Sequence, residues 1–474
     1  MLGKNNYSKW ELSNKASSED DVGRWIADLI LNDYDVIIIK ETDQIYKYNK
    51  GVYTLYDESE LKHKIKLELD EINDSRGFIK IKGTERLRPF IRLSNSLITQ
   101  VENHLHRQII SYNQFDAFPE YVNCLSGVVN LITGSYSPHF GMNKHYLSTI
   151  QIPVTYLKHL ECPNIEKFLI DVFGEDRLSF IYEIISYLLY RSNKFHKSFI
   201  FFGEASSGKT TFIELLRTFL GRGNWTDISI QDIQKKFQMA NLRGMLADIY
   251  DELPLKKIGY MSNFKQIVTN NTLTGEMKGV QGSQIWDSFC KLMFTCNKLP
   301  ETSIDQGDDF WRRIILIHCT AQFNNGKKDF DISKKISTPE ELSGLLNKCV
   351  EHFPNLLRRK HFDQQFDNIA VQGIWQINVN PIKLFLDTNC SLIDGAKEET
   401  EYFRRQVNAF RKQHSALPLT ANTITRKLKD IGIPQPKQKG DGKRYYEGIK
   451  INTSIIDVIE NIILGGQQTL CVKK

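Results

Sequence analysis

The chain has 474 residues, which is more than one hydrophobic core usually organises, so we expect two to four domains. Its apolar fraction of 41% and charged fraction of 25% are ordinary for soluble globular proteins. The formal net charge of +6 is small for this length, so overall charge identifies no binding partner.

The sequence lacks the features that indicate export, membrane insertion or disulfides. The opening MLGKNNYSKWEL has no apolar core segment of a signal peptide, and no run of 18 apolar residues follows. The eight cysteines form no CxxC pair. Cys290, Cys296 and Cys319 lie in apolar runs, which favours packed thiols over the alternative of zinc ligands. We therefore expect a cytoplasmic protein that does not contact membranes.

The first two regions mix helices and strands. Residues 1–90 begin with a helix-like stretch, EDDVGRWIADLIL, and a strand, VIIIK. Two alternating aromatic runs around Asn49-Lys50-Gly51 then predict a β-hairpin, so we expect an α+β N-terminal domain. Residues 91–190 contain VNCLSGVVNLITG, a strand–turn–strand pattern, and end in the helical RLSFIYEIISYLLYRSN, which would form a collar.

The last two regions differ in composition. Residues 191–360 alternate apolar strand-like runs with helix-like stretches, which predicts an α/β domain with a parallel sheet. Residues 376–474 are mostly helical and then become basic. Between Tyr402 and Lys450, twelve Lys or Arg outnumber three Asp or Glu, a local charge of +9. Such a block indicates either a polyanion-binding module or a solvated surface.

A phosphate-binding motif lies in the third region. GEASSGKT, residues 203–210, matches G-x-x-x-x-G-K-[ST] and stands between the strand-like SFIFF and the helix-like TFIELLRTFL, the context that a P-loop requires. Its glycines let the backbone turn successive N–H groups toward phosphate oxygens. Lys209 would contact the β- and γ-phosphates of ATP, and the Thr210 hydroxyl would bind Mg²⁺. The predicted ATP-binding residues are Gly203, Glu204, Ala205, Ser206, Ser207, Gly208, Lys209, Thr210 and Thr211.

Hydrolysis also needs carboxylates at the end of a neighbouring strand. MLADIYDELP supplies Asp251 and Glu252 about forty residues after the P-loop. Asp251 would hold the Mg²⁺ shell, and Glu252 would polarise the attacking water. Asp248 competes for this role, but it lies within the apolar run and has no adjacent glutamate. An acidic pair that merely ends a strand is the structural alternative.

Two further elements follow along the chain. In KLMFTCNKLP an apolar strand ends at Asn297, whose amide would sense the γ-phosphate and orient water; a plain turn is the alternative. In DDFWRRIILIHC, Arg312 and Arg313 precede an apolar strand. An arginine there can reach a neighbouring subunit's nucleotide and neutralise transition-state charge, although the pair by itself also fits a solvated strand start.

The order and spacing of these motifs resemble the superfamily-three helicases of the AAA+ class, especially the phage, plasmid and poxvirus-type primase–helicases of mobile elements and large DNA viruses. VNCLSGVVNLITGSYSP is similar to a segment of that group's pre-helicase domain, with Ser126 in place of the usual Asn of Asn-Gly-Val. FKQIVTNNTLTGEMKG is similar to the segment that leads into its central-pore hairpin. The resemblance covers about residues 90–320.

The resemblance implies a P-loop AAA+ parallel-sheet core at 191–360, a pre-helicase domain at 91–190 and a hexameric ring that binds ATP between subunits. It implies that Arg313 is the arginine finger, with Arg312 as the second choice. It also implies that Lys278, at the tip of the pore hairpin, contacts the backbone of single-stranded DNA in the central channel.

Many relatives also carry a primase, whose polymerase chemistry requires clustered carboxylates for two metal ions. The first region offers only Asp33-Tyr34-Asp35 at a short spacing, with no convincing partner, and it is short for such a domain. We therefore expect no intrinsic primase activity, and a separate primase or initiator as a partner.

The basic end of the chain has the pattern of a winged helix–turn–helix. A helix-like run follows Thr420, and two strand-like pieces then surround a Gly-Asp-Gly turn. Such a C-terminal winged-helix-like domain would bind double-stranded DNA, whereas the alternative is a helical cap with a solvated basic face. The predicted contacts are Arg426, Lys427 and Lys429 on the recognition helix and Lys443 and Arg444 on the wing.

Together these motifs predict an ATP-driven replicative DNA helicase of a mobile genetic element or virus, with Mg²⁺ as cofactor. One alternative is a replication initiator that binds DNA and uses ATP as an assembly switch, without processive unwinding. Another is a ring ATPase that translocates or packages DNA. Strand displacement from a forked duplex separates the helicase from the switch.

Overall fold

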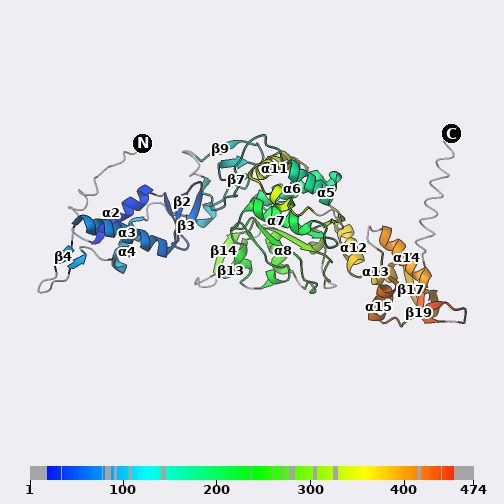
Figure 1. Ribbon diagram of the computed structural model, residues 1–474. Helices are drawn as coiled ribbons and strands as arrows, with labels where there is room; N and C mark the ends of the chain where they lie inside the picture. The colour runs from blue at the N-terminus through cyan, green and yellow to red at the C-terminus, as the bar shows by residue number, and fades with distance from the viewer. Residues whose placement is uncertain are drawn as a thin grey trace.

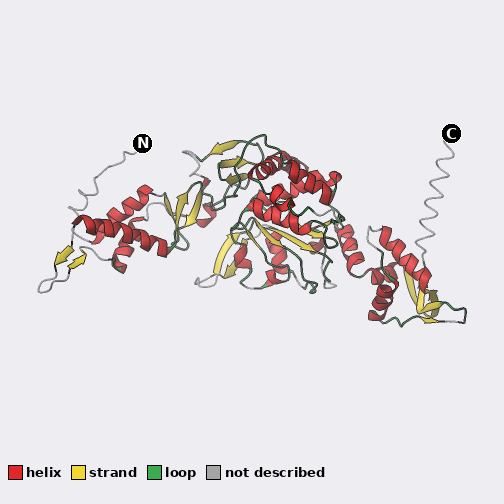
Figure 2. Ribbon diagram, viewed as in Figure 1, coloured by secondary structure: helices red, strands yellow, loops and turns green. Residues whose placement is uncertain are grey.

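The computed structural model describes residues 19–33, 35–76, 78–80, 87–89, 93–105, 109–139, 146–235, 237–259, 261–269, 272–276, 283–302, 307–323, 329–413, 418–438 and 440–452. Over these residues the chain is a mixed α/β protein with a five-stranded parallel sheet and several antiparallel sheets. An N-terminal unit, a central unit built on the parallel sheet and a C-terminal unit follow one another along the molecule (Figures 1 and 2).

The N-terminal unit packs helices against a sheet of order β3-β2-β1-β6. Its elements are α2 (Glu19–Asp33), β1 (Val36–Ile39), β2 (Ile45–Asn49), β3 (Val52–Leu55), α3 (Glu58–Arg76), β4 (Phe78–Lys80), β5 (Leu87–Pro89), α4 (Asn95–Leu105), β6 (Ile109–Ile110) and the 3₁₀ turn η1 (Tyr112–Gln114). The predicted hairpin is confirmed, because Asn49 pairs with Val52 across a two-residue turn. Both turn residues, Lys50 and Gly51, have positive φ, as a tight hairpin turn requires.

The N-terminal unit continues past residue 90, where the sequence pattern predicted its end. The short strand β6 pairs parallel to β1 and extends the sheet. Helix α4 buries Leu97, Val101 and Leu105 in the same core as α2. The segment up to Phe115 therefore packs with the first region, because its apolar side chains complete that core.

The central unit is organised by a parallel sheet of order β11-β12-β15-β10-β16. Its strands are β10 (Ser198–Phe202), β11 (Trp225–Thr226), β12 (Ala247–Tyr250), β15 (Lys291–Cys296) and β16 (Ile314–His318). Strands β10 and β15 are buried along their whole length, as expected for a parallel sheet with both faces covered. Alternate residues enter opposite cores: Phe199 and Phe201 pack on one face, and Ile200 and Phe202 on the other.

Helices cover both faces of this sheet (Figure 2). The first face carries α5 (Pro163–Phe173), α6 (Leu178–Leu189), α7 (Lys209–Leu220) and α11 (Pro339–Arg359). The second carries α8 (Ser262–Val268), α9 (Asp308–Trp311) and α12 (Asn368–Val379). Short turns of helix complete the unit: η3 (Glu175–Arg177), η4 (Asp232–Gln234), η5 (Met239–Leu242) and α10 (Ile332–Lys335).

Helices α5 and α6 share one continuous core with α7 and α11. A domain boundary near residue 190, as the sequence pattern suggested, would divide this core. A buried polar contact joins the same elements. Glu183 of α6 accepts hydrogen bonds from the side chain of Arg359 and from the backbone N–H of Asp363, the latter at 3.0 Å. Residues near 160–190 therefore pack as part of the central unit.

Two small antiparallel sheets flank the central unit. The predicted strand–turn–strand is confirmed as β7 (Tyr121–Cys124) and β8 (Gly127–Asn130), to which β9 (Tyr136–Pro138) adds a third strand. A hairpin of β13 (Thr272–Glu276) and β14 (Ser283–Asp287) lies where the sequence predicted the pore hairpin. Its tip, with Lys278, lies outside the described residues.

The C-terminal unit has its own core and a sheet of order β17-β19-β18. Its elements are α13 (Pro381–Asn389), β17 (Cys390–Glu399), α14 (Thr400–Gln413), α15 (Ala421–Asp430), β18 (Lys437–Gln438) and β19 (Arg444–Ile451). The predicted cap of α15 is present, since the Thr420 hydroxyl accepts a hydrogen bond from the Thr423 N–H at 3.3 Å.

Helix α12 belongs to two cores at once. Its Trp375 is buried with the second face of the parallel sheet, and its Ile377 is buried in the C-terminal unit. Two cations of the C-terminal unit hold its last turn: Arg411 donates to the carbonyl of Ile377 at 2.7 Å, and Lys427 donates to that of Val379 at 3.1 Å. Positive groups at these otherwise unpaired carbonyls stabilise the helix C-terminus.

Two glycines in helices provide a matched test of this packing. A Cβ at Gly344 of α11 would collide with the backbone carbonyl of Glu161, whereas a Cβ at Gly373 of α12 would meet nothing within 4 Å. We expect Gly344→Ala to cost about 1–3 kcal/mol by overpacking and to lower the thermal midpoint by several degrees. Gly373→Ala should be neutral or stabilising, because alanine favours helix. Equal midpoints for the two variants, measured by thermal denaturation, would contradict the close approach of α11 to Glu161.

Candidate functional site

The segment from Gly203 to Gly208 forms a compact loop between β10 and α7, as the sequence predicted. Ser206 and Gly208 have φ values of 60° and 87°, in the left-handed region. At Gly208 an added Cβ would lie 2.6 Å from Val172 Cγ2, and at Gly203 it would collide with the Cys319 carbonyl. Glycine is therefore required at both ends of the loop, where the chain passes its neighbours too closely for a side chain.

Lys209 begins α7 and turns its side chain back into this loop. Its Nζ donates to the carbonyls of Gly203 and Glu204, each at 2.8 Å, and lies 3.0 Å from the Ser207 hydroxyl. The side chain is buried. Neutral oxygens are weaker acceptors than phosphate oxygens, so the ammonium is placed to exchange these contacts for an anion at the helix N-terminus.

Two carboxylates stand beside the loop, at the end of β12. The Thr295 hydroxyl on β15 donates to the Asp251 carboxylate and accepts the Glu252 backbone N–H at 2.8 Å. Asn297 Nδ2 donates to Glu252 Oε1 at 3.0 Å. Glu252 itself has a φ of 62°, a strained value for a residue that is not glycine. The contacts of Thr295 and Asn297 therefore fix where both carboxylates point.

Thr295 is a site residue that the sequence reasoning missed. It lies inside the apolar run KLMFTC and is almost fully buried, so its position in the sequence suggests only a core side chain. A single threonine in a run of strand residues has no local pattern that signals a polar role. Only the pairing of β12 with β15 shows which carboxylates its hydroxyl meets.

Asp248, the competing carboxylate, does not belong to this site. It is fully buried, and its Oδ1 accepts hydrogen bonds from the Thr226 hydroxyl at 2.7 Å and from the Ile228 N–H at 2.8 Å. Burial raises the pKa of this carboxyl to about 7. It therefore ties β12 to β11 and to the chain that follows it, which leaves Asp251 and Glu252 as the acidic pair beside the loop.

The loop and the carboxylates line one cavity of about 790 Å³. This volume lies within the range of small-molecule and cofactor sites. The opposite wall comes from α5, with Asn164, Lys167 and Phe168, and from Phe323 and Lys335 farther along the chain. Of the residues predicted for phosphate binding, Ala205 to Thr211 line this cavity and Gly203 and Glu204 do not. The residues predicted for Mg²⁺ binding and water activation, Asp251, Glu252 and Asn297, line it as well, and its volume has room for a nucleotide.

The two arginines before β16 lie outside this cavity of their own chain. Arg313 is buried and donates from Nη1 to the carbonyl and the carboxylate of Asp309. Arg312 is 57% exposed in its side chain and pairs with the Asp309 carboxylate at 2.5 Å. The resemblance implied Arg313 first for a contact with a neighbouring subunit, but Arg312 is the arginine that solvent reaches.

The C-terminal unit presents most, but not all, of its predicted basic contacts on the outside. Arg426 and Lys429 on α15 and Arg444 on β19 are exposed. Lys443 is exposed and pairs with Glu399 at 3.0 Å. Lys427 differs, because its amine is bound to the last turn of α12 and burial lowers its pKa. The structure therefore separates Lys427 from the predicted DNA-contacting group.

The cysteines in the central unit are buried thiols, as their apolar surroundings predicted: Cys290, Cys296 and Cys319 are all free and buried. Burial raises the pKa of the Cys296 and Cys319 thiols to about 12, so they are poor metal ligands and nucleophiles. Among the described residues, no three His, Cys, Asp or Glu side chains are grouped to hold a metal ion.

None of the helices described here combines the length and the apolarity that a bilayer crossing demands.

Comparison with known families gives two matches, each over less than half of the chain. Residues 23–174 match the family described as D5 N terminal like. Residues 201–313, from the P-loop to Arg313, match DUF5906, a family of unknown function. The first match spans the N-terminal unit and the start of the central unit. The second begins within β10 and ends just before β16, so it covers most of the parallel sheet.

The solved structures that match this chain include three of the NrS-1 C-terminal region. The apo structure of residues 305–718 matches with 13% identity and a TM-score of 0.44, covering 90% of this chain and 99% of that one. Two A-form apo structures match with 12% identity and TM-scores of 0.46 and 0.45, covering 90% of this chain and 99% and 98% of theirs. Likeness at this level carries no argument about function. The curated proteins contain no match.

Proposed function

We propose that this chain is an ATP-driven replicative DNA helicase of a mobile genetic element or virus, built on a P-loop AAA+ core. The observation that carries the proposal is the meeting of Lys209, Asp251, Glu252 and Asn297 at one cavity, from the ends of three neighbouring parallel strands. The order of these residues along the chain is also that of the superfamily-three helicases, which the sequence resembles.

The chemistry assigns a distinct role to each side chain. The backbone of residues 203–208 and the Lys209 ammonium would hold the phosphates of ATP. Thr210 and Asp251 would hold Mg²⁺, which neutralises charge on the phosphates when bound. The Glu252 carboxylate would accept the proton of the attacking water. Asn297, which is hydrogen-bonded to Glu252, would keep that carboxylate directed at the γ-phosphate.

The family match supports a role in replication. The D5 N terminal like match at 23–174 overlaps the part of the chain that resembles the pre-helicase domain of viral and mobile-element primase–helicases. The sequence of the first region offers only Asp33-Tyr34-Asp35 as closely spaced carboxylates for polymerase chemistry, so a separate primase or initiator remains part of the proposal.

A homo-oligomeric ring, of six subunits by the resemblance, would complete the catalytic site. The two arginines before β16 do not line the cavity of their own chain, so in this proposal one of them would contact ATP bound to a neighbouring subunit. Single-stranded DNA would then lie in the central channel, against the tips of the β13–β14 hairpins, where Lys278 is expected.

The C-terminal unit would bind duplex DNA as a winged helix–turn–helix. Helices α14 and α15 are joined by a short connection, and the β18–β19 hairpin follows α15 in the position of a wing. Three of its cations, Arg426, Lys429 and Arg444, are exposed on these elements. A recognition helix with exposed cations is suited to the major groove and its phosphates.

The second candidate is an initiator that uses ATP as an assembly switch. The attachment of α12 to both cores fits this function too, because a duplex-binding module fixed to an ATPase suits recognition of a DNA site as well as unwinding. A forked duplex with a labelled strand distinguishes the two functions. Displacement of the strand with ATP supports the helicase, and stable binding without displacement supports the switch.

Substitutions in the cavity test the division of roles. Lys209→Ala should abolish ATP binding, whereas Glu252→Gln should bind ATP and lower its turnover by about 10²-fold or more, the usual contribution of a general base. The matched control is Glu214→Gln, because Glu214 lines the same cavity from α7 without contacting the carboxylate pair. Nucleotide binding and phosphate release would be measured separately. Wild-type turnover by Glu252→Gln would remove Glu252 from the proposed mechanism.

The two arginines can be told apart by stability and trans complementation. Arg312→Ala should keep the wild-type thermal midpoint and ATP binding but lose ATPase activity, because its side chain is exposed. Arg313→Ala should lower the midpoint, because it removes a buried side chain and its hydrogen bonds to Asp309. Mixing Arg312→Ala with Lys209→Ala subunits should restore some hydrolysis at mixed interfaces. If Arg312→Ala kept full ATPase activity and a folded Arg313→Ala lost it, Arg313 would be the arginine finger, as the resemblance implied.

Cations on the wing and the cation that contacts α12 should differ in their effect on the salt dependence of duplex binding. Replacing Lys443 and Arg444 together with alanine should weaken binding to all sequences and flatten the slope of log K against log salt by about two units. Lys427→Ala removes one positive charge from the same unit, but it should leave the salt slope unchanged because its amine contacts α12. Titrations of the full chain with duplex at several salt concentrations measure both. A larger loss of slope for Lys427→Ala than for the wing pair would refute the assignment.

A further inference from the structure

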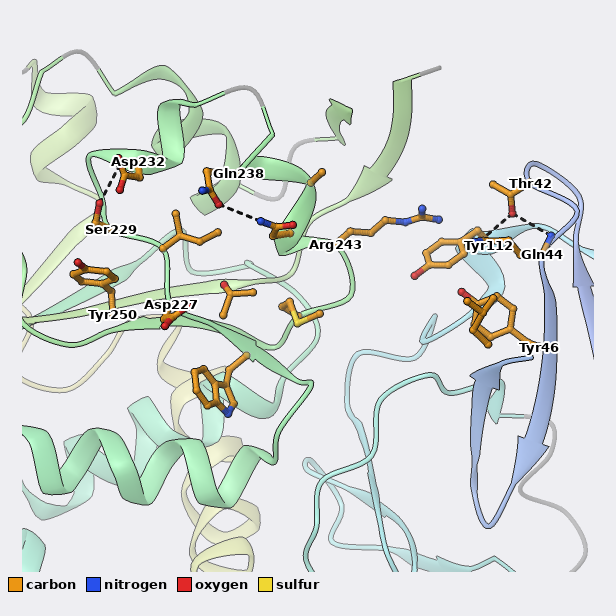
Figure 3. A pocket seen from close by; sticks show the side chains of 17 residues that line it. Thr42, Gln44, Tyr46, Tyr112, Asp227, Ser229, Asp232, Gln238, Arg243 and Tyr250 are labelled. Carbon is orange, nitrogen blue, oxygen red and sulfur yellow. Dashed lines mark hydrogen bonds between the residues drawn. The ribbon is translucent and has the colours of Figure 1, made fainter. Parts of the chain in front are cut away.

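A second large cavity, of about 1050 Å³, lies between the N-terminal unit and the central unit (Figure 3). Thr42, Gln44, Tyr46 and Tyr112 line it from the N-terminal side. The central side comes from the chain around β11, from η5 and from the end of β12. The interunit cleft, as we call it, uses none of the residues that line the P-loop cavity.

Aromatic rings come into this cleft from several separate segments. Tyr46 lies on β2 and Tyr112 on η1, and Trp225 and Tyr250 lie on β11 and β12. Figure 3 shows Arg243 extending from the central unit toward Tyr112. Its guanidinium lies 3.7 Å from the centre of the Tyr112 ring, as in a cation–π contact. Flat surfaces therefore face the cleft from both units.

The polar groups in the cleft suit a neutral ligand better than a polyphosphate. Gln44, Gln238 and Asn241 supply amide groups that both donate and accept hydrogen bonds. Arg243 is the cationic side chain in the wall, and Asp227 and Asp232 are also there. The Asp232 carboxylate pairs with Lys235 at 2.7 Å, and that contact lowers its pKa. The charged side chains of the wall thus carry no excess of positive charge, so recognition here would fall on the neutral part of a ligand, and any phosphates would have to stay in the solvent.

We propose that the interunit cleft binds unpaired nucleobases. A nucleobase is planar, nearly neutral and edged by donors and acceptors, so it matches aromatic and guanidinium faces with amides between them. The base would stack on the tyrosines of the N-terminal unit and on Arg243, with its edge toward Gln44 or Asn241. The volume admits more than one nucleoside, which favours a short stretch of single strand over a free nucleoside as the source.

Because this cleft is separate from the P-loop cavity, base binding does not depend on ATP hydrolysis. The two cavities are nevertheless lined by consecutive residues at the end of β12. Tyr250 lines the interunit cleft, and the next two residues, Asp251 and Glu252, line the P-loop cavity. The cleft is also distinct from the β13–β14 hairpin and from the C-terminal unit, where the proposed function places DNA.

Photo-crosslinking locates the base directly. The full chain, without ATP, would be irradiated with a single-stranded thymidine oligonucleotide carrying 5-iodo-2′-deoxyuridine, which crosslinks to aromatic side chains, and the peptides would be mapped by mass spectrometry. We expect crosslinks at Tyr46, Tyr112 or Tyr250. Arg243→Ala should reduce their yield about fivefold or more, in line with the loss of one stacking contact. The matched control, Arg222→Ala, removes an exposed arginine outside the cleft and should leave the yield unchanged.

The same measurement distinguishes a single strand from a free nucleoside as the source of the base. It also distinguishes binding in the interunit cleft from binding at the P-loop cavity. Crosslinking by the oligonucleotide but not by free 5-iodo-2′-deoxyuridine assigns the cleft to single strands, and equal crosslinking by both assigns it to nucleosides. The Lys209→Ala background should retain the cleft crosslinks, so a failure of the ATPase proposal leaves this one intact. A Gln44→Ala variant with a wild-type thermal midpoint should also crosslink less, which excludes unfolding as the cause. Crosslinks confined to other peptides, or equal yields from Arg243→Ala and Arg222→Ala, would overturn the proposal.

Discussion

The hydroxyl of Thr295 is the contact on which the candidate catalytic site depends. It lies between two carboxylate residues, donating to Asp251 and accepting the backbone N–H of Glu252. This arrangement requires that β12 and β15 stay in register, which the burial of β15 between its neighbours enforces. Because a parallel sheet aligns the ends of its strands at one edge, the P-loop after β10 then meets both carboxylates without further adjustment.

The features that could be predicted from the sequence are those encoded in short segments. Each of these features consists of turn or polar residues next to an apolar run, and each lies where its pattern indicated. They are the glycine-rich loop after β10, the acidic pair after β12, Asn297 after β15 and the turn at Lys50-Gly51. Turn chemistry and strand ends are local properties, so they survive folding unchanged. Which other element a helix or strand packs against is not a local property. The predicted region boundaries and the predicted exposure of single cations differ from the structure for this reason.

Three particulars show this limit. Strand β6 has two residues, too few for any periodicity, and only its pairing with β1 assigns it to the N-terminal unit. Helix α6 is largely apolar, with Glu183 as its one charged residue, which indicates burial but not which core surrounds it. Lys427 and Lys429 are indistinguishable in a basic helix, yet the first turns inward to a carbonyl and the second outward to solvent. Burial of individual charges depends on tertiary packing, as it does for Arg313.

The helix that belongs to two cores has a mechanical consequence. Helix α12 contains 12 residues, about 18 Å of continuous helix, and it is buried at one end in the central unit and gripped at the other by Arg411 and Lys427. A connection of this kind is a stiff lever rather than a tether. Any tilt of the parallel sheet would swing the C-terminal unit through the same angle, so that a ligand held there would experience torque instead of slack.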